Sequence, residues 1–236
     1  MRYSGSLVKK EREQIFELFL NHEKLKFNEI EKAVNVKSNM AAYHIEKMIE
    51  EGLLGKKGLY YYLTKKGEQY IPIFEHIIGE ELSPTPVVLV SIVKDDKILL
   101  IKRNKRPYKD YWSMIGGKIK LDETFEKTSL RLVKNKTNLN GEFKSINAVF
   151  HEQVTEEQTI KHSFILFFTK VEVQNEEFKE SKAGKLQWFK IEEIKEKEII
   201  PSDYWLIKNK LNSKVKIESA EMKEKNGKIS ELRFKD

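Results

Sequence analysis

The stretch GGKIKLDETFEKTSLRLVKNKTNL (residues 116–139) decides the fold of the second half of this chain. Gly117 is followed after five residues by Glu123, and Glu123 after seven residues by Arg131. A glycine-rich loop that leads into a helix can hold a phosphate, because the first N–H groups of a helix lack backbone partners. We expect a helix that starts near residues 122–124, with its apolar side chains turned inward.

Strand patterns surround this loop and helix. The run VVLVSIVKDDKILLIKR (87–103) predicts a hairpin of two buried strands with a turn at Asp95-Asp96. Further strands are expected at about 142–152, 160–173 and 185–194. A final helix is expected at 202–211, with Ser202 as its N-cap.

Over roughly residues 85–211 the chain resembles the Nudix hydrolase family. The resemblance rests on the strand KILLIKR, the approach YWSMIGGKIKLDET, the Gly117–Glu123–Arg131 skeleton and the downstream LQWFKIEEI before the last helix. It implies a Nudix-like domain at 87–212, built as an α/β/α sandwich with a mixed sheet. In that family, carboxylates of the signature hold Mg²⁺ or Mn²⁺ and ready a water for attack on a diphosphate.

The chain departs from the family signature after Arg131. Where the signature has a glutamate and then a pair of glutamates, this chain has Leu132, Asn135 and Lys136. Hard divalent ions need clustered oxygen anions, so we predict no metal site, no cofactor and no catalytic residue here. Glu123 is expected to pair with Arg131 as a structural brace. The alternative is a Nudix-type diphosphate hydrolase with an accessory helical domain, and only that alternative requires Mg²⁺.

A domain that has lost its catalytic carboxylates can keep a ligand pocket. An arginine beside an aromatic ring suits a nucleotide or a phosphosugar, because the guanidinium binds phosphate and the ring stacks on a base. For Trp112, core packing is an equally simple interpretation. The candidate ligand-binding residues are Arg103, Trp112, Gly116, Gly117, Glu123 and Arg131.

The first eighty residues predict a separate helical module. Helices are expected at 8–22, 27–34 and from Ser38 to about Gly52, followed by two short strands around the turn 55–58 and a further helix at 66–78. This order resembles a winged helix-turn-helix domain. The resemblance implies a DNA-binding domain at 1–80, joined by a linker at 81–86, and the overall class is α+β.

In such a domain the third helix enters the major groove and the hairpin lies against the phosphate backbone. Residues 32–66 carry seven Lys against three Glu, whereas 67–82 carry four Glu and no basic residue. The alternative is that these lysines are only solvated and that Tyr43 and His44 lie on the helix surface without a DNA role. The candidate DNA-binding residues are Lys37, Ser38, Asn39, Tyr43, His44, Lys47, Lys56 and Lys57.

Composition limits the other possibilities. The chain has 236 residues, a net charge of +7 and no Cys, which excludes disulfides, thiolate metal sites and a Cys nucleophile. Its first residues, MRYSGSLVKKERE, lack the apolar core of a signal peptide, and the longest apolar runs are only strand-length. We therefore expect a cytoplasmic protein with no membrane partner.

The C-terminal extension, 213–236, contains Asn226-Gly227 between alternating runs, which is a strong hairpin signal. It could extend the sheet, pack between domains or form a dimer contact. Taken together, the sequence favours a homodimeric, ligand-responsive transcription regulator that binds double-stranded DNA. In known Nudix-related regulators the DNA-binding part commonly follows the Nudix part, so the order here is reversed. Two rivals remain: the hydrolase, and an interaction protein that binds no DNA.

Overall fold

The computed structural model forms two compact units, Met1–Ser83 and Pro84–Asp236, which are described separately. The division falls within the predicted linker. No helix among the described residues is long and apolar enough to cross a membrane. The structure describes residues 7, 9–74, 83–179, 184–225 and 228–235.

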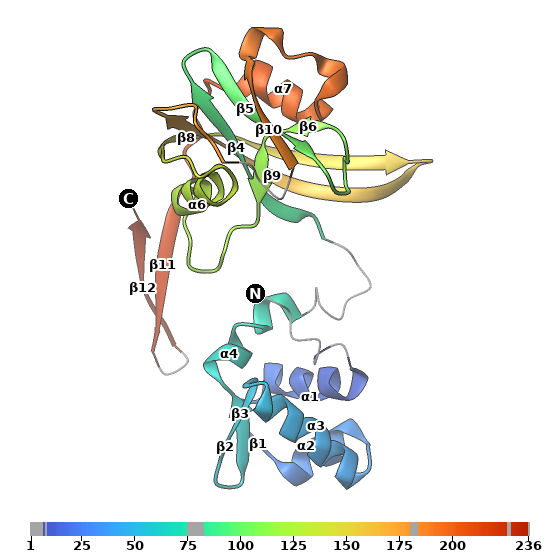
Figure 1. The fold of residues 1–236 in the computed structure, drawn as a ribbon. Coiled ribbons are helices and arrows are strands. Elements are labelled where there is room, and N and C mark those ends of the chain that lie inside the picture. Colours follow the sequence, from blue (N-terminus) through green and yellow to red (C-terminus); the bar gives the residue numbers. More distant parts are fainter. Residues whose placement is uncertain (1–6, 8, 75–82, 180–183, 226–227, 236) are drawn as a thin grey trace. The chain divides into compact units, whose positions relative to one another are not determined.

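The described part of the first unit has three main helices, a short fourth helix and a small antiparallel sheet of order β1-β3-β2 (Figure 1). The three predicted helices and the hairpin are all present. The predicted helix at 66–78 is instead a short α4 followed by a 3-10 turn, because Pro72 has no N–H to continue an α-helix; residues 75–78 lie outside the described residues. The elements are α1 (Lys10–Asn21), β1 (Leu25–Lys26), α2 (Phe27–Val34), α3 (Ser38–Glu50), β2 (Leu54–Lys57), β3 (Tyr60–Leu63), α4 (Lys65–Glu68) and η1 (Ile71–Ile73).

A buried polar cluster joins α1 to α3. Arg12 is only 5% exposed, and it donates from Nε to Nδ1 of His44 at 3.3 Å and from Nη1 to Glu51 at 3.2 Å. His44 is 3% exposed, and burial lowers its pKa. The structure therefore removes His44 from the predicted DNA-contacting set, because its ring is enclosed between the two helices.

The second unit is a mixed sheet of seven strands with the order β10-β5-β4-β9-β8, to which β6 and β7 are added beside β5 and β4. The strands β4 and β9 run parallel, and the other pairs are antiparallel. Its elements are β4 (Thr85–Lys94), β5 (Lys97–Arg103), β6 (Trp112–Ser113), β7 (Ile115–Gly117), α6 (Phe125–Thr137), β8 (Gly141–Glu156), β9 (Thr159–Val173), β10 (Gly184–Lys190), η2 (Ile191–Glu193), η3 (Glu196–Glu198) and α7 (Pro201–Lys210).

Helices cover both faces of this sheet (Figure 1). Side chains alternate along β4, so Val88 and Val90 share a buried cluster with Val133 of α6. Leu89 shares the opposite cluster with Leu206 of α7. A strand that is buried on both faces reads as a continuous apolar run, which is why VVLVSIV was recognisable. The predicted mixed sheet between helices is confirmed.

Two helix starts refine the sequence predictions. Thr124 is the N-cap of α6, and its hydroxyl accepts the N–H of Lys127 at 3.2 Å. The helix α7 begins at Pro201, one residue earlier than predicted, and Ser202 is therefore inside the helix rather than its cap. Proline is favoured at the first helical position because its missing N–H would have no partner there.

The C-terminal hairpin consists of β11 (Ser219–Lys225) and β12 (Lys228–Lys235), which pair with each other. Its predicted turn, 226–227, lies outside the described residues. Its large apolar side chains, Met222, Ile229, Leu232 and Phe234, are between 56% and 65% exposed.

Candidate functional site

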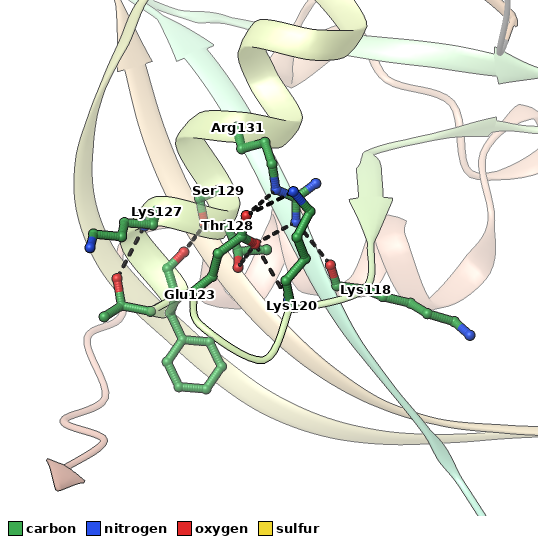
Figure 2. Close-up of polar contacts among 9 residues, drawn as sticks. Lys118, Lys120, Glu123, Lys127, Thr128, Ser129 and Arg131 are labelled. Carbon is green, nitrogen blue, oxygen red and sulfur yellow. Dashed lines mark hydrogen bonds and ion pairs between the residues drawn. The ribbon is translucent and has the colours of Figure 1, made fainter. Parts of the chain in front are cut away.

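The glycine-rich loop is fastened to α6 by one carboxylate, that of Glu123 (Figure 2). Arg131 donates from Nε to Oε1 of Glu123 at 2.5 Å and from Nη2 to Oε2 at 2.7 Å. The hydroxyl of Thr128 donates to the same Oε2 at 2.9 Å, and the N–H of Lys120 lies 3.4 Å from it. Arg131 also donates to the carbonyl of Lys118 at 3.0 Å, so it ties both ends of the loop.

These contacts determine the charge state of Glu123. The hydrogen bonds from Arg131, and then those from Thr128 and Lys120, lower the pKa of Glu123 to about 2 against the opposing effect of desolvation. Its side chain is 11% exposed, and both of its oxygens are used within the unit. The predicted brace between Glu123 and Arg131 is confirmed.

The three departures from the family signature lie on the following turns of α6. Leu132 is 5% exposed, and a Cβ built on Gly117 would come within 2.5 Å of its Cδ2, so Leu132 fills the space beside the glycine. Asn135 is exposed. Lys136 reaches back to the sheet and donates from Nζ to the carbonyl of Gly116 at 2.9 Å. Burial, and secondarily the charge of Arg103, lower the pKa of Lys136.

Beside the glycines lies an open cavity of about 240 Å³. Most of its wall is apolar and comes from β4, β9 and the chain before α7. A few polar groups from β5, β8 and α7 converge in the same cavity, an arrangement typical of small-molecule sites. The lining residues are Val87, Leu89, Arg103, Pro107, Tyr108, Ser113, Met114, Gly116, Gly117, Lys118, Glu152, Phe164, Leu166, Ile200 and Asp203.

The loop after β5 is fastened across this cavity to β8. Arg103 donates from Nε to the carbonyl of Pro107 at 2.9 Å, and its guanidinium lies 5.9 Å from the centre of the Tyr108 ring. The hydroxyl of Tyr108 donates to Glu152 at 2.7 Å. Burial, and then this bond to Glu152, raise the pKa of Tyr108, which stays protonated.

Asp203, in the first turn of α7, is the most deeply buried acid of the cavity at 3% exposure. Its Oδ2 accepts the N–H of Met114 at 2.6 Å. Burial, with a smaller contribution from the charge of Glu152, raises the pKa of Asp203 to about 7, against the opposing effects of the Met114 hydrogen bond and the charge of Arg103. Near neutral pH this carboxyl can therefore be protonated, and it then offers both a donor and an acceptor.

The cavity contains only part of the predicted ligand-binding set. Arg103, Gly116 and Gly117 line it. Trp112 does not, because its ring packs edge-on against Phe189 at 4.8 Å in the core. Glu123 and Arg131 also lie outside the wall, because they are engaged with each other.

The ligand-binding set predicted from sequence contains none of Asp203, Tyr108 and Glu152. A signal for Asp203 was present. It lies three and four residues before Leu206 and Ile207, on the buried face of the last helix, and a carboxyl at an apolar position is a functional-site candidate.

In the first unit, most of the predicted DNA-contacting side chains are accessible. Lys37, Asn39 and Tyr43 are exposed on or before the first turns of α3, and Lys56 and Lys57 are exposed at the end of β2. Other contacts restrict some of the set: the hydroxyl of Ser38 donates to Glu31, Lys47 pairs with Glu50 at 2.5 Å, and Lys56 lies over the Tyr61 ring at 5.2 Å.

A comparison with protein-family models matches residues 83–209 to the NUDIX domain. The chain belongs to the NUDIX domain family. The match includes the glycine-rich loop, α6, the cavity and Asp203, and it ends within α7.

Among characterised proteins, the ADP-ribose pyrophosphatase of Methanocaldococcus jannaschii is 39% identical over 69 residues, which are 29% of this chain. The matched segment spans 41% of that relative's length. Among solved structures, the mutator MutT protein from Bacillus halodurans is 24% identical and matches with a TM-score of 0.47 over 63% of this chain and 96% of its own. A UDP-X diphosphatase is 17% identical, with a TM-score of 0.42 over 86% of this chain and 93% of its own.

The NUDIX signature positions of this chain do not fit the family's divalent metal. A leucine side chain offers no ligand, the amide of Asn135 is neutral, and the ammonium of Lys136 repels a cation and is already bonded to Gly116. Among the residues that the structure describes, no three or more His, Asp or Glu side chains are grouped to hold a metal ion.

Proposed function

We propose that the NUDIX unit binds a nucleotide or a phosphosugar and does not hydrolyse it by the family's metal-dependent reaction. The observation that carries the proposal is one cavity that joins apolar walls to a convergent polar group made by Arg103, Glu152 and Asp203. The ring of the ligand would lie in the cavity. Its phosphates would lie at the end formed by Gly116, Gly117 and Lys118.

The cavity supports recognition of a heterocyclic ring. Leu89, Phe164 and Leu166 offer an apolar surface. Tyr108, in the loop after β5, also lines the cavity, and its hydroxyl is bonded to Glu152 of β8. At its polar end, a protonated Asp203 can donate one hydrogen bond and accept another, which matches the neighbouring donor and acceptor of a nucleobase edge. An ionised Asp203 can only accept.

The chemistry of α6 supports binding without turnover. Metal-assisted attack on a diphosphate needs carboxylates that hold the ion and lower the pKa of its bound water. This chain has Leu132, Asn135 and Lys136 at the positions in question, and Glu123 is engaged by Arg131. The proposed function therefore includes no metal-dependent step.

For the unit Met1–Ser83 we propose a winged helix-turn-helix domain that binds double-stranded DNA, with α3 in the major groove. The order of α1, α2, α3 and the β2–β3 hairpin supports this. So do the exposed Lys37 just before α3, Asn39 and Tyr43 on α3, and Lys56 and Lys57 on the wing. A homodimer of the whole chain would then be a ligand-responsive transcription regulator.

A thermal-shift screen of nucleotides and phosphosugars, run in EDTA and again in Mg²⁺, tests the binding proposal. Tryptophan fluorescence reports on the NUDIX unit alone, because Trp112, Trp188 and Trp205 are the three tryptophans of the chain. A ligand at about 100 times its Kd should stabilise the unit by roughly 2.7 kcal/mol. If no compound of either class stabilises it in EDTA, the proposal fails.

The second candidate is diphosphate hydrolysis, which family membership and the archaeal relative support more directly than they support regulation. Under this candidate, turnover requires Mg²⁺ and carboxylates from outside the signature positions. Release of a nucleoside monophosphate from any compound of the same screen, in Mg²⁺ and not in EDTA, would establish it.

A further inference from the structure

The position of Lys136 on α6 is unusual for a lysine. It lies in the last turn of the helix, but its side chain runs inward to the carbonyl of Gly116 rather than out to solvent. Burial opposes the charged form of this ammonium. A lysine on a helix surface has a free route to water, so its inward course indicates a specific interaction at the glycine strand.

A second cation, Arg103, lines the same cavity as Gly116, the residue whose carbonyl binds Lys136. After burial, the charge of Arg103 is the second cause that lowers the pKa of Lys136. Within the described residues, neither has a carboxylate at ion-pair distance: Lys136 is bonded to Gly116, and Nε of Arg103 is bonded to Pro107. Two cations that form no ion pair with a carboxylate favour an anion beside them, and the neighbouring Asp203 does not oppose this while it is protonated.

The anion site lies at one end of the cavity. Arg103 and Gly116 both line the cavity, whereas Lys136 is not part of the wall and is joined to it by its bond to the Gly116 carbonyl. The acidic groups of the cavity, Glu152 and Asp203, are engaged with Tyr108 and Met114 respectively. The cavity therefore has an end suited to a ring and an end suited to a negative charge.

We propose that the ammonium of Lys136, together with Arg103, binds the phosphate groups of the ligand in the role that a divalent cation has in catalytic NUDIX domains. The ligand class rests on the proposed function, since the ring of that ligand would fill the cavity. The consequence is specific to this chain: phosphate binding requires no metal, and it depends on a residue of the signature helix that the family does not use in this way.

Titration calorimetry of the full chain with inorganic pyrophosphate in EDTA tests the subsite without any ring. Lys136→Met should weaken pyrophosphate binding roughly tenfold or more, the value of one charge-assisted hydrogen bond. Lys136→Arg should retain most of the affinity. Lys134→Met is the matched control, because Lys134 is exposed in the same helical turn and, among the described residues, bonds only to Asn138 and Asn140.

Pyrophosphate that binds only in Mg²⁺, or equally well to wild type and Lys136→Met, would overturn the subsite. If circular dichroism shows that Lys136→Met is unfolded, Arg103→Met tests the other half of the pair, and it should also lose affinity. A second titration with adenosine and ADP-ribose separates the two proposals. Lys136-dependent binding of pyrophosphate without binding of either ring compound would support the subsite and exclude adenine nucleotides, and the same result across the whole screen would refute the proposed function.

Discussion

Replacing Asp203 by asparagine should remove a pH-dependent loss of unfolding free energy from the NUDIX unit. Asparagine keeps an oxygen for the N–H of Met114 but cannot ionise. The pKa of Asp203 is raised from 3.8 to about 7, so the folded state keeps a proton that the unfolded chain releases. Stability from this group is therefore full below pH 3.8 and is lost as the pH rises through 7, with a slope of about 1.4 kcal/mol per pH unit.

From about pH 5 to about pH 8, the wild type should lose about 2–3 kcal/mol of unfolding free energy relative to Asp203→Asn. Urea unfolding followed by tryptophan fluorescence measures this difference for the NUDIX unit alone. The comparison with the variant cancels the titration of all other groups. Asp122→Asn is the control, because it removes an exposed carboxyl and should follow the wild type. A difference that stays constant with pH would show that Asp203 is ionised throughout and would refute the reasoning.

Three further substitutions test other parts of the structure. Glu123→Gln should lower the urea midpoint at neutral pH, and the deficit should shrink as the pH falls from 4.5 toward 2, where wild-type Glu123 itself becomes protonated. Gly117→Ala should destabilise the unit by roughly 1–3 kcal/mol, because its Cβ would clash with the side chain of Leu132. In a Leu132→Ala background this clash is absent, so Gly117→Ala should cost less there. Lys56→Glu with Lys57→Glu should abolish salt-sensitive binding to duplex DNA, measured by fluorescence anisotropy.

Each of these three has a control and a contradicting result. Glu126→Gln changes an exposed glutamate of α6 and should have little effect on the midpoint; an equal effect of both changes would contradict the brace. An undisturbed Gly117→Ala variant would contradict the close packing of the loop on α6. Lys127→Glu with Lys134→Glu makes the same charge change on exposed lysines of α6. Equal loss of DNA binding in both double variants would show that only net charge matters.

The elements of the NUDIX unit were predictable because their signals are local. The run of apolar residues in β4 reflects burial on both faces of the strand. Glu123 and Arg131 are close in the sequence, in a loop and the helix that follows it, so their contact could be predicted from their spacing. Trp112 could not be assigned from its residue type, because a large aromatic side chain suits a core and a binding site equally. Its partner, Phe189, lies 77 positions away in the sequence.

The chemistry of the cavity was harder to predict because it depends on contacts that are distant in the sequence. Asp203 acquires its raised pKa from burial and from the charge of Glu152, which lies on β8, about fifty positions earlier in the sequence. Lys136 could be recognised from sequence as the wrong charge for a metal site, but its bond to Gly116 exists only in the folded sheet. His44 is a different case. It lies on the same helical face as Ala41 and Met48, so the helical spacing of the buried residues could have predicted that His44 is buried.

Titration of the full chain with ADP-ribose, in EDTA and in Mg²⁺, with chromatography of the mixture afterwards, separates metal-independent binding from metal-dependent hydrolysis. We expect ADP-ribose to bind with the same affinity in both conditions and to be recovered intact. Binding that appears only in Mg²⁺, followed by release of AMP and ribose 5-phosphate, would contradict this expectation and would identify this chain as a metal-dependent NUDIX hydrolase.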